Sequence, residues 1–506
     1  MPMGNPKETK YRPLSQVLVM TLVWGLAAHG FILTNKFSTN DDIRYLFGAG
    51  ATITSGRWFL EVAARLTRLV LGGPLCSSPL FCGLISLLLL GLSLWMLFDL
   101  FDISDFWVRI LLTGAAVASP SMAGLLGYLF TAPFYMLALA LCVAGAWLIC
   151  RRHTLLWTAV GVGCIACGIG IYQAYLPVVL CILLVNFIRW IVSEQEITPK
   201  KALGQVLFYC GASAGFMGVY FLASKVCLAV TGGNLTDYNG ISQVWDKSLR
   251  FYLNRAVYAM GLMLHPGQTG MYPFRTELVY YGILALTVGY ALYLLADTFR
   301  RDACRGWFLL AALAAWPLGM NFIYVMCSEH VHALMLYAHA ILPMLLMCLA
   351  KACPKLPGRR AAAVLLALLC VGYVRYDNYC YTRFAFFQQR STNYLNRFVS
   401  RIESVPGYDE TMPVAYIGEK IPIAQTFREI PGFAEAGLMP LTDYQAIIDD
   451  WDWRIYLDYW CGFAPEEVDP AAFWDNPQVK AMPPYPAAGS VCIIDGTVVV
   501  KLDAAE

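Results

Sequence analysis

Long apolar runs separated by short polar segments dominate this sequence. A helix needs about 20 apolar residues to cross the hydrocarbon core of a bilayer. By that measure the sequence contains eleven candidate spans, at residues 14–34, 80–98, 106–123, 130–150, 154–172, 174–192, 203–230, 277–296, 307–326, 333–350 and 360–374. The pattern therefore predicts an all-α polytopic membrane protein with about eleven transmembrane helices.

The composition agrees with this pattern. Of the 506 residues, 58% are hydrophobic and only 14% are charged, so the chain has far more apolar surface than a soluble core could bury. The net charge is +2, and the sequence contains no long Lys/Arg tract. We exclude a nucleic-acid partner, because such a partner requires a basic patch. The expected surroundings are the lipid bilayer.

Basic clusters predict the orientation of the chain, since short cytoplasmic loops are enriched in Lys and Arg. With the N-terminus inside, four other basic clusters also fall inside, at residues 151–152, 200–201, 300–305 and 351–360. Three segments then face the exterior, namely the loops 35–79 and 231–276 and the region that follows the last span.

The C-terminal region has a mixed composition that differs from the apolar part. Its segment MPVAYIG is typical of a strand, and SVCIIDGTVVVKL has the central Asp-Gly of a β-hairpin. We expect two domains, a transmembrane domain at 1–375 and a small extracytoplasmic α+β domain at 376–506. The cysteines of the second domain could pair in an oxidising compartment, and the sequence leaves that open for Cys380, Cys461 and Cys492.

Two adjacent carboxylates, Asp41 and Asp42, follow the first apolar run in the segment STNDD. Ser, Thr or Asn in this segment can cap a helix, and acidic residues in a first turn interact favourably with the helix dipole. Capping explains one carboxylate and leaves the other available for chemistry. The sequence does not decide which is which.

The same outer loop also predicts an amphipathic helix in GRWFLEVAARLTRLV. Charged positions share one face and apolar positions share the other, with Arg57, Glu61, Arg65 and Arg68 opposite Phe59, Val62, Leu66 and Leu69. This pattern is typical of a helix that lies in the membrane interface. We therefore expect an interfacial helix in the first outer loop.

Carboxylates beside arginines at a membrane surface suit the transfer of a sugar from a lipid phosphate to a hydroxyl. A carboxylate can accept the proton of the attacking hydroxyl. Arginines such as Arg44 and Arg57 can bind the departing phosphate, although arginines at a bilayer edge also simply reach for lipid headgroups. The reaction needs no nucleotide, and the sequence has no Gly-rich phosphate loop.

Polar residues at two other outer positions are candidates for substrate contact. Tyr172 and Gln173 lie at the outer end of the fifth span, where they contact either a sugar or another helix. In SEHVH, three further side chains are expected to line the acceptor or phosphate site, namely Glu329, His330 and His332. These three lack the i, i+4 spacing of a metal site, so we assign no metal ligands. The sequence leaves open whether a divalent cation, Mg²⁺ or Mn²⁺, binds at the donor phosphate.

Three motifs together resemble the type II glucosyltransferase family, which contains the serotype-converting O-antigen glucosyltransferases. They are Asp41-Asp42 after the first span, Ser55-Gly56-Arg57-Trp58, and Ile171-Tyr172-Gln173. The resemblance covers about residues 14–375. It implies a C-type glycosyltransferase-like bundle in a bacterial plasma membrane. It also implies an inverting transfer from a polyprenyl-phosphate-linked sugar, commonly undecaprenyl phosphate glucose, to a cell-surface polysaccharide or lipid-linked glycan.

By the same resemblance, Asp41 or Asp42 is the base and Arg57 contacts the donor phosphate or supports the site. Two other functions stay as alternatives. A transporter or flippase for a lipid-linked oligosaccharide also needs many spans, but transporters often carry charges or helix breaks near mid-membrane. Here the charges gather in the outer loops, which favours surface chemistry. A polysaccharide-assembly scaffold without activity would tolerate Asn at both acidic positions.

Overall fold

The computed structural model describes most of the chain between residues 14 and 503. The described ranges are 14–38, 40–152, 154–194, 197–236, 247–327, 331–419, 421, 430, 432–433 and 452–503. The chain divides into two compact units. The first comprises Met1–Lys36 and Phe47–Asn378, and the second comprises Phe37–Leu46 and Tyr379–Glu506.

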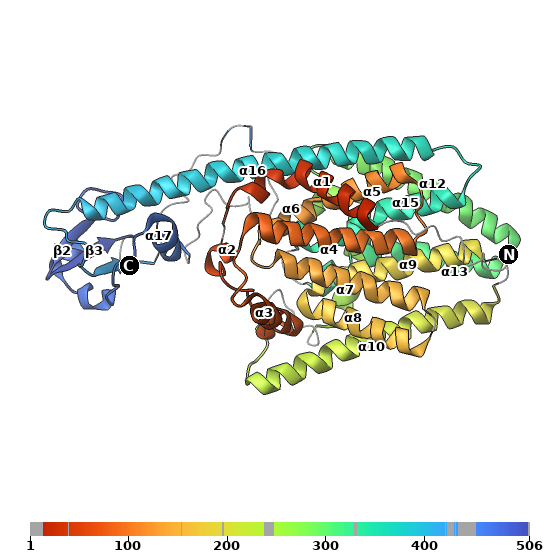
Figure 1. Ribbon diagram of the computed structural model, residues 1–506, viewed down its shortest axis with the longest axis horizontal. Coiled ribbons are helices and arrows are strands. Elements are labelled where there is room, and N and C mark those ends of the chain that lie inside the picture. The colour runs from red at the N-terminus through yellow and green to blue at the C-terminus, as the bar shows by residue number, and fades with distance from the viewer. Residues whose placement is uncertain are drawn as a thin grey trace. The chain divides into compact units, whose positions relative to one another are not determined.

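The first unit is a bundle of helices (Figure 1). Its longer helices are α1 (Leu14–Thr34), α3 (Trp58–Leu71), α4 (Pro79–Leu100), α5 (Phe106–Val117), α7 (Ala132–Arg151), α8 (Leu155–Ile171), α9 (Leu176–Ser193), α10 (Pro199–Thr231), α11 (Leu249–Gly261), α12 (Thr276–Arg301), α13 (Ala303–Met320) and α15 (Leu342–Ala352). Short helices connect them, namely α6 (Pro120–Leu126), α14 (Ile323–Met326), η1 (Ile53–Ser55), η2 (Gln173–Tyr175), η4 (Leu262–Leu264), η5 (Pro266–Thr269), η6 (Ala333–Met335) and η7 (Tyr337–Ile341). Helix α16 (Arg359–Glu403) begins in this unit and ends in the second one.

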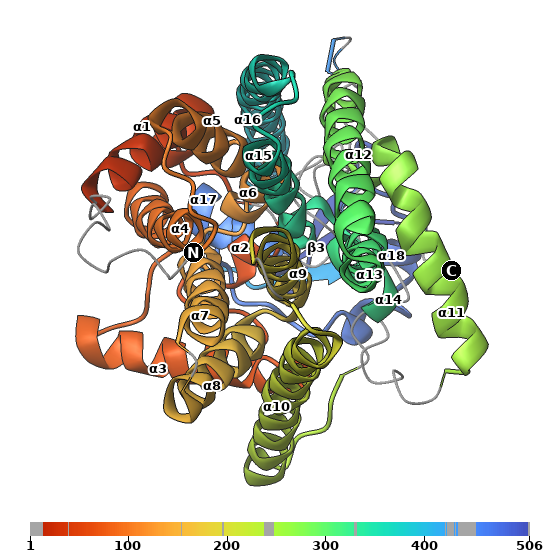
Figure 2. The same ribbon diagram turned by 90° about the vertical axis from the view of Figure 1, so that its right-hand side faces the viewer.

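Neighbouring helices of the bundle pack in chain order on one side. Helix α1 packs on α4, α4 on α7, and α7 on α8. Helix α9 contacts α7, α13 and α15, and the end-on view in Figure 2 places it inside the bundle. The α7–α8 contact is close because glycines lie on both helices. A Cβ atom at Gly145 would approach the carbonyl oxygen of Gly161 to 2.5 Å.

The helices agree with a polytopic membrane protein. Among the described residues, eight helices are long and apolar enough to cross a bilayer, or nine if the pair α5 and α6, bent by 49°, forms one span. Two of the predicted spans correspond to shorter apolar helices, at Leu155–Ile171 and Tyr337–Ala352. The total of eleven therefore stays a prediction.

One predicted segment of the first part extends further than expected, and another forms as expected. The last predicted span, 360–374, is only part of α16, which continues for 45 residues. The predicted amphipathic helix forms as α3 and ends at Gly72, in the left-handed conformation. Its apolar side is open, with Leu69 and Val70 about four-fifths exposed at 80% and 79%. Its position in the membrane interface stays a prediction.

The second unit contains a three-stranded sheet in the order β1-β3-β2. Strand β1 (Val414–Ile417) pairs parallel with β3 (Thr497–Lys501), and β2 (Val491–Ile494) pairs antiparallel with β3. The predicted Asp-Gly hairpin joins β2 and β3, with positive φ at both Asp495 and Gly496. The other elements are α2 (Asn40–Arg44), α17 (Trp453–Cys461), η10 (Pro470–Phe473), α18 (Pro477–Ala481) and the end of α16.

The core of the second unit is rich in aromatic side chains from distant parts of the sequence. Phe398 of α16, Tyr416 of β1 and Trp453 of α17 pack together with ring centroids 5.0–6.3 Å apart. Ile43 of α2 belongs to the same cluster. Among the described residues, no disulfide joins the three cysteines that the sequence left open for pairing, Cys380, Cys461 and Cys492.

Candidate functional site

The two adjacent carboxylates of α2 have opposite surroundings. Asp41 is exposed to solvent, whereas Asp42 is completely buried. The Oγ of Ser38 donates a hydrogen bond of 2.8 Å to Oδ2 of Asp42. A buried carboxylate with a hydrogen-bond donor supports the local fold, while an exposed carboxylate is accessible to a substrate. The structure thus separates the two candidates that the sequence could not distinguish.

Helix α2 is held by residues of the second unit from far along the chain. Phe37, just before the helix, packs edge-on against Phe384 with ring centroids 5.3 Å apart. The backbone N–H of Ser38 donates to Oε1 of Gln388 at 3.4 Å. Ile43 is fully buried in the aromatic core. The acidic segment is therefore built into the C-terminal unit, although the sequence placed it in the transmembrane part.

Arg44, a predicted phosphate contact, forms an ion pair instead of standing in open solvent. Its Nε and Nη2 lie 3.1 and 3.0 Å from Oδ1 of Asp452. The Asp452 side chain is only 2% exposed, whereas that of Arg44 is 43% exposed. Partial burial alone would lower the pKa of Arg44, but the carboxylate of Asp452 outweighs this effect, so the pKa is raised. Asp452 gave no signal in the sequence, because 408 residues separate the pair.

The motif Ser55-Gly56-Arg57-Trp58 lies between η1 and α3 in the first unit. Gly56 adopts a left-handed conformation with φ of 72°, which turns the chain into α3. The amide Nε2 of Gln173 donates to the carbonyl oxygen of Ser55 at 3.0 Å, and the hydroxyl of Tyr220 donates to that of Gly56 at 3.2 Å. The polar side chains at this point thus satisfy the backbone of the turn.

The guanidinium of Arg57 faces two stacked tyrosine rings. The Cζ atom of Arg57 lies 5.7 Å from the ring centre of Tyr135 and 5.8 Å from that of Tyr172. These two rings are parallel within 11°, with centroids 4.0 Å apart. A guanidinium within about 6 Å of an aromatic centre is held by cation–π attraction. The rings therefore restrict where the charge of Arg57 can lie.

Trp58 completes the contact between the two motifs of the first unit. A Cβ atom at Gly170 would lie 2.7 Å from the indole of Trp58, so this indole requires a glycine opposite it. The sequence-predicted residues Arg57, Tyr172 and Gln173 are therefore brought together. Sequence reasoning missed Tyr135 and Tyr220, which lie in other apolar segments and have no motif around them.

The outer histidine segment is only partly within the described residues. Glu329 and His330 lie outside them. His332 is half-buried, and its carbonyl oxygen accepts the N–H of Met335 at the start of η6. Within the described part of the chain, no group of three or more His, Cys, Asp or Glu side chains could hold a metal ion.

A buried polar network lies further along the same segment. Nδ1 of His339 is 3.0 Å from the hydroxyl of Tyr272, and its Nε2 is 3.0 Å from Oδ1 of Asn321. The Nδ2 of Asn321 donates to the carbonyl oxygen of Ala259. A neutral imidazole protonated at Nε2 satisfies both contacts, since it accepts from the tyrosine and donates to the asparagine. His339 thus joins the connection between η5 and α12 to the end of α13, and Asn321 extends the network to α11.

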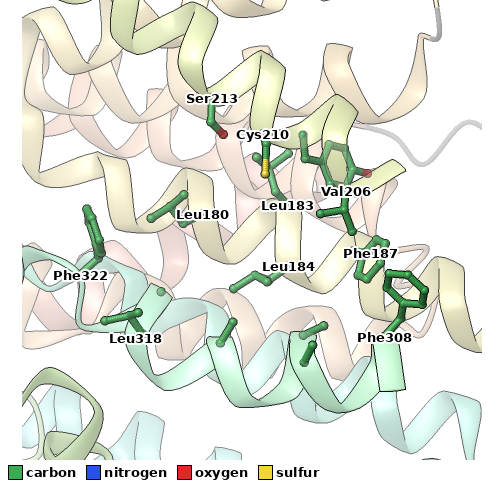
Figure 3. Close-up of a pocket in the computed structure, with 15 residues that line it drawn as sticks. Leu180, Leu183, Leu184, Phe187, Val206, Cys210, Ser213, Phe308, Leu318 and Phe322 are labelled. Carbon is green, nitrogen blue, oxygen red and sulfur yellow. The ribbon is translucent and has the colours of Figure 1, made fainter. Parts of the chain in front are cut away.

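An apolar cavity of about 560 Å³ lies between α9, α10 and α13. Figure 3 shows its lining side chains, which are nearly all apolar and include Leu180, Phe187, Val206, Phe308 and Phe322. Ala311 and Ala315 of α13 also line it and are themselves exposed. A volume of this size lies in the range of ligand-binding pockets. The cavity therefore has the size and lining for a hydrocarbon chain.

The predicted site residues thus fall in two groups. Asp41, Asp42 and Arg44 belong to the second unit, and Arg57, Tyr172, Gln173 and His332 belong to the first. In the first group one carboxylate is accessible. In the second group a guanidinium is held by aromatic rings beside a glycine turn. The long apolar helices of the described residues define the protein as an all-α polytopic membrane protein.

The comparison with protein families assigns the chain more narrowly. The sequence model of the family described as Glucosyl transferase GtrII matches residues 30–349, which include the acidic pair and both motifs of the first unit. The chain belongs to this family, and the resemblance found in the sequence is confirmed. The family places the chain among the glycosyltransferases. The chain matches no curated protein and no solved structure.

Proposed function

We propose that the protein is a membrane glucosyltransferase that moves a hexose from a polyprenyl-phosphate donor to a glycan acceptor, with Asp41 as the general base. The family description indicates that this hexose is glucose. The observation that carries this assignment is the contrast within α2. Asp41 is exposed, whereas Asp42 is buried and bound by Ser38. A base must lie within hydrogen-bond reach of the hydroxyl that it deprotonates, and only an exposed carboxylate offers that.

The chemistry of the proposed step follows from these groups. The acceptor hydroxyl oxygen attacks the anomeric carbon of the donor sugar, and its proton passes to the carboxylate of Asp41. The bond between the anomeric carbon and the phosphate oxygen breaks, and its electron pair leaves with the polyprenyl phosphate. Attack from the face opposite the phosphate inverts the anomeric configuration.

Arg57 is the proposed partner of the departing phosphate. A guanidinium presents several N–H donors in a fixed plane, which match phosphate oxygens. The stacked rings of Tyr135 and Tyr172 restrict that plane before the substrate arrives. Electrostatic stabilisation of developing charge is most effective when the charged group is already in place. Arg44 has a weaker claim to this role, because Asp452 already binds it.

The apolar cavity supports a lipid-linked donor. Its walls come from α9, α10 and α13, and α9 directly follows the Tyr172-Gln173 motif. A prenyl chain in this cavity would keep the donor's phosphate near the membrane surface. We propose that part of the donor's hydrocarbon tail occupies this cavity.

The proposed setting is the plasma membrane of a bacterium, with eleven spans in a C-type bundle. The four basic clusters support a cytoplasmic N-terminus and an extracytoplasmic C-terminal α+β domain. The shorter apolar helices at Leu155–Ile171 and Tyr337–Ala352 would supply the spans beyond those of full length. The acceptor is then a cell-surface polysaccharide or a lipid-linked glycan.

The direct test uses the purified protein in nanodiscs. Polyprenyl phosphate carrying ¹⁴C-glucose is added with extracts of surface glycan, and label in the glycan is measured over time. The proposal expects transfer of label with inversion at the anomeric carbon. Movement of an unmodified lipid-linked glycan across proteoliposome membranes, with no transfer of label, would instead establish the flippase alternative.

A further inference from the structure

Helix α2 is connected to the start of α17 from both of its ends. On the N-terminal side, Ser38 binds Gln388, and Nε2 of Gln388 donates to the hydroxyl of Tyr456 at 2.8 Å. On the C-terminal side, Arg44 binds Asp452, which directly precedes α17. Between the two ends, Ile43 is buried in the core of the second unit. Both connections therefore meet at the first turn of α17.

These anchors matter because α2 is too short to be a stable helix by itself. It spans five residues, Asn40–Arg44, and the N–H of Tyr45 donates to the carbonyl oxygen of Asp41 at 2.8 Å at its end. Isolated helices shorter than about 12–15 residues are marginal in water. The position of Asp41 is therefore set by the anchors around it.

We propose that the C-terminal unit positions the acidic pair for the transfer reaction, with Asp452 as a positioning residue that acts through Arg44. This inference rests on the proposed function, in which Asp41 is the base. Residues Asp41 and Arg44 lie three positions apart on α2, and side chains at this spacing share one face of a helix. By holding Arg44, Asp452 fixes the turn of the helix that presents Asp41.

The ion pair suits this role because one partner is buried and the other is accessible. Asp452 is 2% exposed and is itself part of the second unit's interior. Its carboxylate offers Arg44 a fixed point, since buried side chains have little freedom to move. Misplacement of a reacting group by about 1 Å can cost about 100-fold in rate. The C-terminal region of about 130 residues would thus contribute to the reaction by positioning α2.

The test replaces Asp452 by Asn, which keeps the shape and removes the charge. Two quantities are measured in nanodiscs: hydrogen exchange of the backbone amides at 41–46 by mass spectrometry, and the transfer rate per donor-binding site. Asp452→Asn is expected to speed the exchange about tenfold. It is expected to lower the transfer rate about 10- to 100-fold and to leave the KM for the lipid donor within about twofold.

A matched control lies on the same helix. Arg454 of α17 pairs with Glu467, with Nη1 and Oε2 3.4 Å apart, and neither residue belongs to the anchors of α2 described above. Glu467→Gln is expected to leave both the exchange at 41–46 and the transfer rate unchanged. Asp452→Glu keeps the negative charge, and it is expected to restore most of the rate lost in Asp452→Asn.

Each outcome decides one question. If Asp452→Asn exchanges and reacts like the unmodified protein, the positioning role is wrong. It is also wrong if that variant only reduces the number of donor-binding sites while each remaining site reacts at the normal rate. If Asp41→Asn reacts normally, the proposed base is wrong, and the hydrogen exchange alone then decides whether Asp452 anchors α2.

Discussion

At the scale of single residues, side chains that are close in the sequence have very different surroundings. Asp42 contributes to the fold through Ser38, and Asp41 is left accessible. Arg44 and Arg57, which the sequence offered as equivalent phosphate contacts, are held by a carboxylate and by aromatic rings respectively. Two neighbouring segments of the chain thus place their arginines by different kinds of contact.

Asp42→Asn is expected to weaken the fold more than the reaction. The substitution removes a buried carboxylate that accepts a hydrogen bond from Ser38, and a disturbed buried hydrogen bond costs about 1–3 kcal/mol. Thermal unfolding in detergent should therefore shift to lower temperature, while the transfer rate of the folded protein stays within about tenfold. A loss of transfer without any loss of stability would make Asp42 the base instead.

Arg57→Lys is expected to raise the KM for the donor about tenfold or more, because Lys keeps the charge but loses the planar stacking on Tyr135 and Tyr172. Arg68→Lys is the control, since Arg68 lies exposed in the last turn of α3. Steady-state kinetics with varied donor concentration provide the measurement. Equal KM values for both variants would contradict the role given to Arg57.

At the scale of elements, contacts around the turn at Gly56 join the start of α3 to the bundle. Gln173 and Tyr220 hold the turn from η2 and α10, and Trp58 packs on Gly170 of α8. These contacts bring three separate helices to the start of α3. The position of Arg57 therefore depends on how the bundle packs.

Gly56→Ala is expected to disturb this junction beyond the cost of its backbone conformation. The new Cβ would lie 2.8 Å from the hydroxyl of Tyr220 and 3.0 Å from Nε2 of Gln173. Gly72→Ala is a matched control, because Gly72 has the same φ of 72° and nothing within 4 Å of its Cβ position. The unfolding temperature and the transfer rate should both fall further for Gly56→Ala than for Gly72→Ala. Equal effects in both variants would show that only backbone strain matters.

Ala315→Trp is expected to fill the cavity and raise the KM for a long-chain donor about tenfold, with little change for a donor that has a short chain. Ala314→Trp places the same bulk on an exposed neighbour in α13 that does not line the cavity. Its KM values should match those of the unmodified protein. A cavity variant that keeps its preference for long chains would show that the tail binds elsewhere.

At the scale of the whole molecule, the sequence predicts the apolar helices far better than the contacts between distant segments. The length and apolar character of each run are local properties, and every predicted span falls on helical segments of the structure. The grouping of residues 37–46 with the C-terminal unit is not local, because its partners Gln388 and Asp452 lie hundreds of residues away.

The candidate site shows the same division. Arg57 and Gln173 were candidates from the sequence, and the structure brings their two motifs together. Tyr135 and Tyr220 could not be predicted, because the sequence around a tyrosine in an apolar run does not indicate which residue its ring or hydroxyl contacts. Burial separated Asp41 from Asp42, and no property of two adjacent identical residues could predict that difference.

The most direct test of the central claim compares Asp41→Asn with the unmodified protein in the labelled-donor assay. Loss of a general base typically lowers a rate by about 10²- to 10⁴-fold. The account predicts a loss of this size at unchanged expression and unchanged binding of the lipid donor. Full transfer by Asp41→Asn would contradict it.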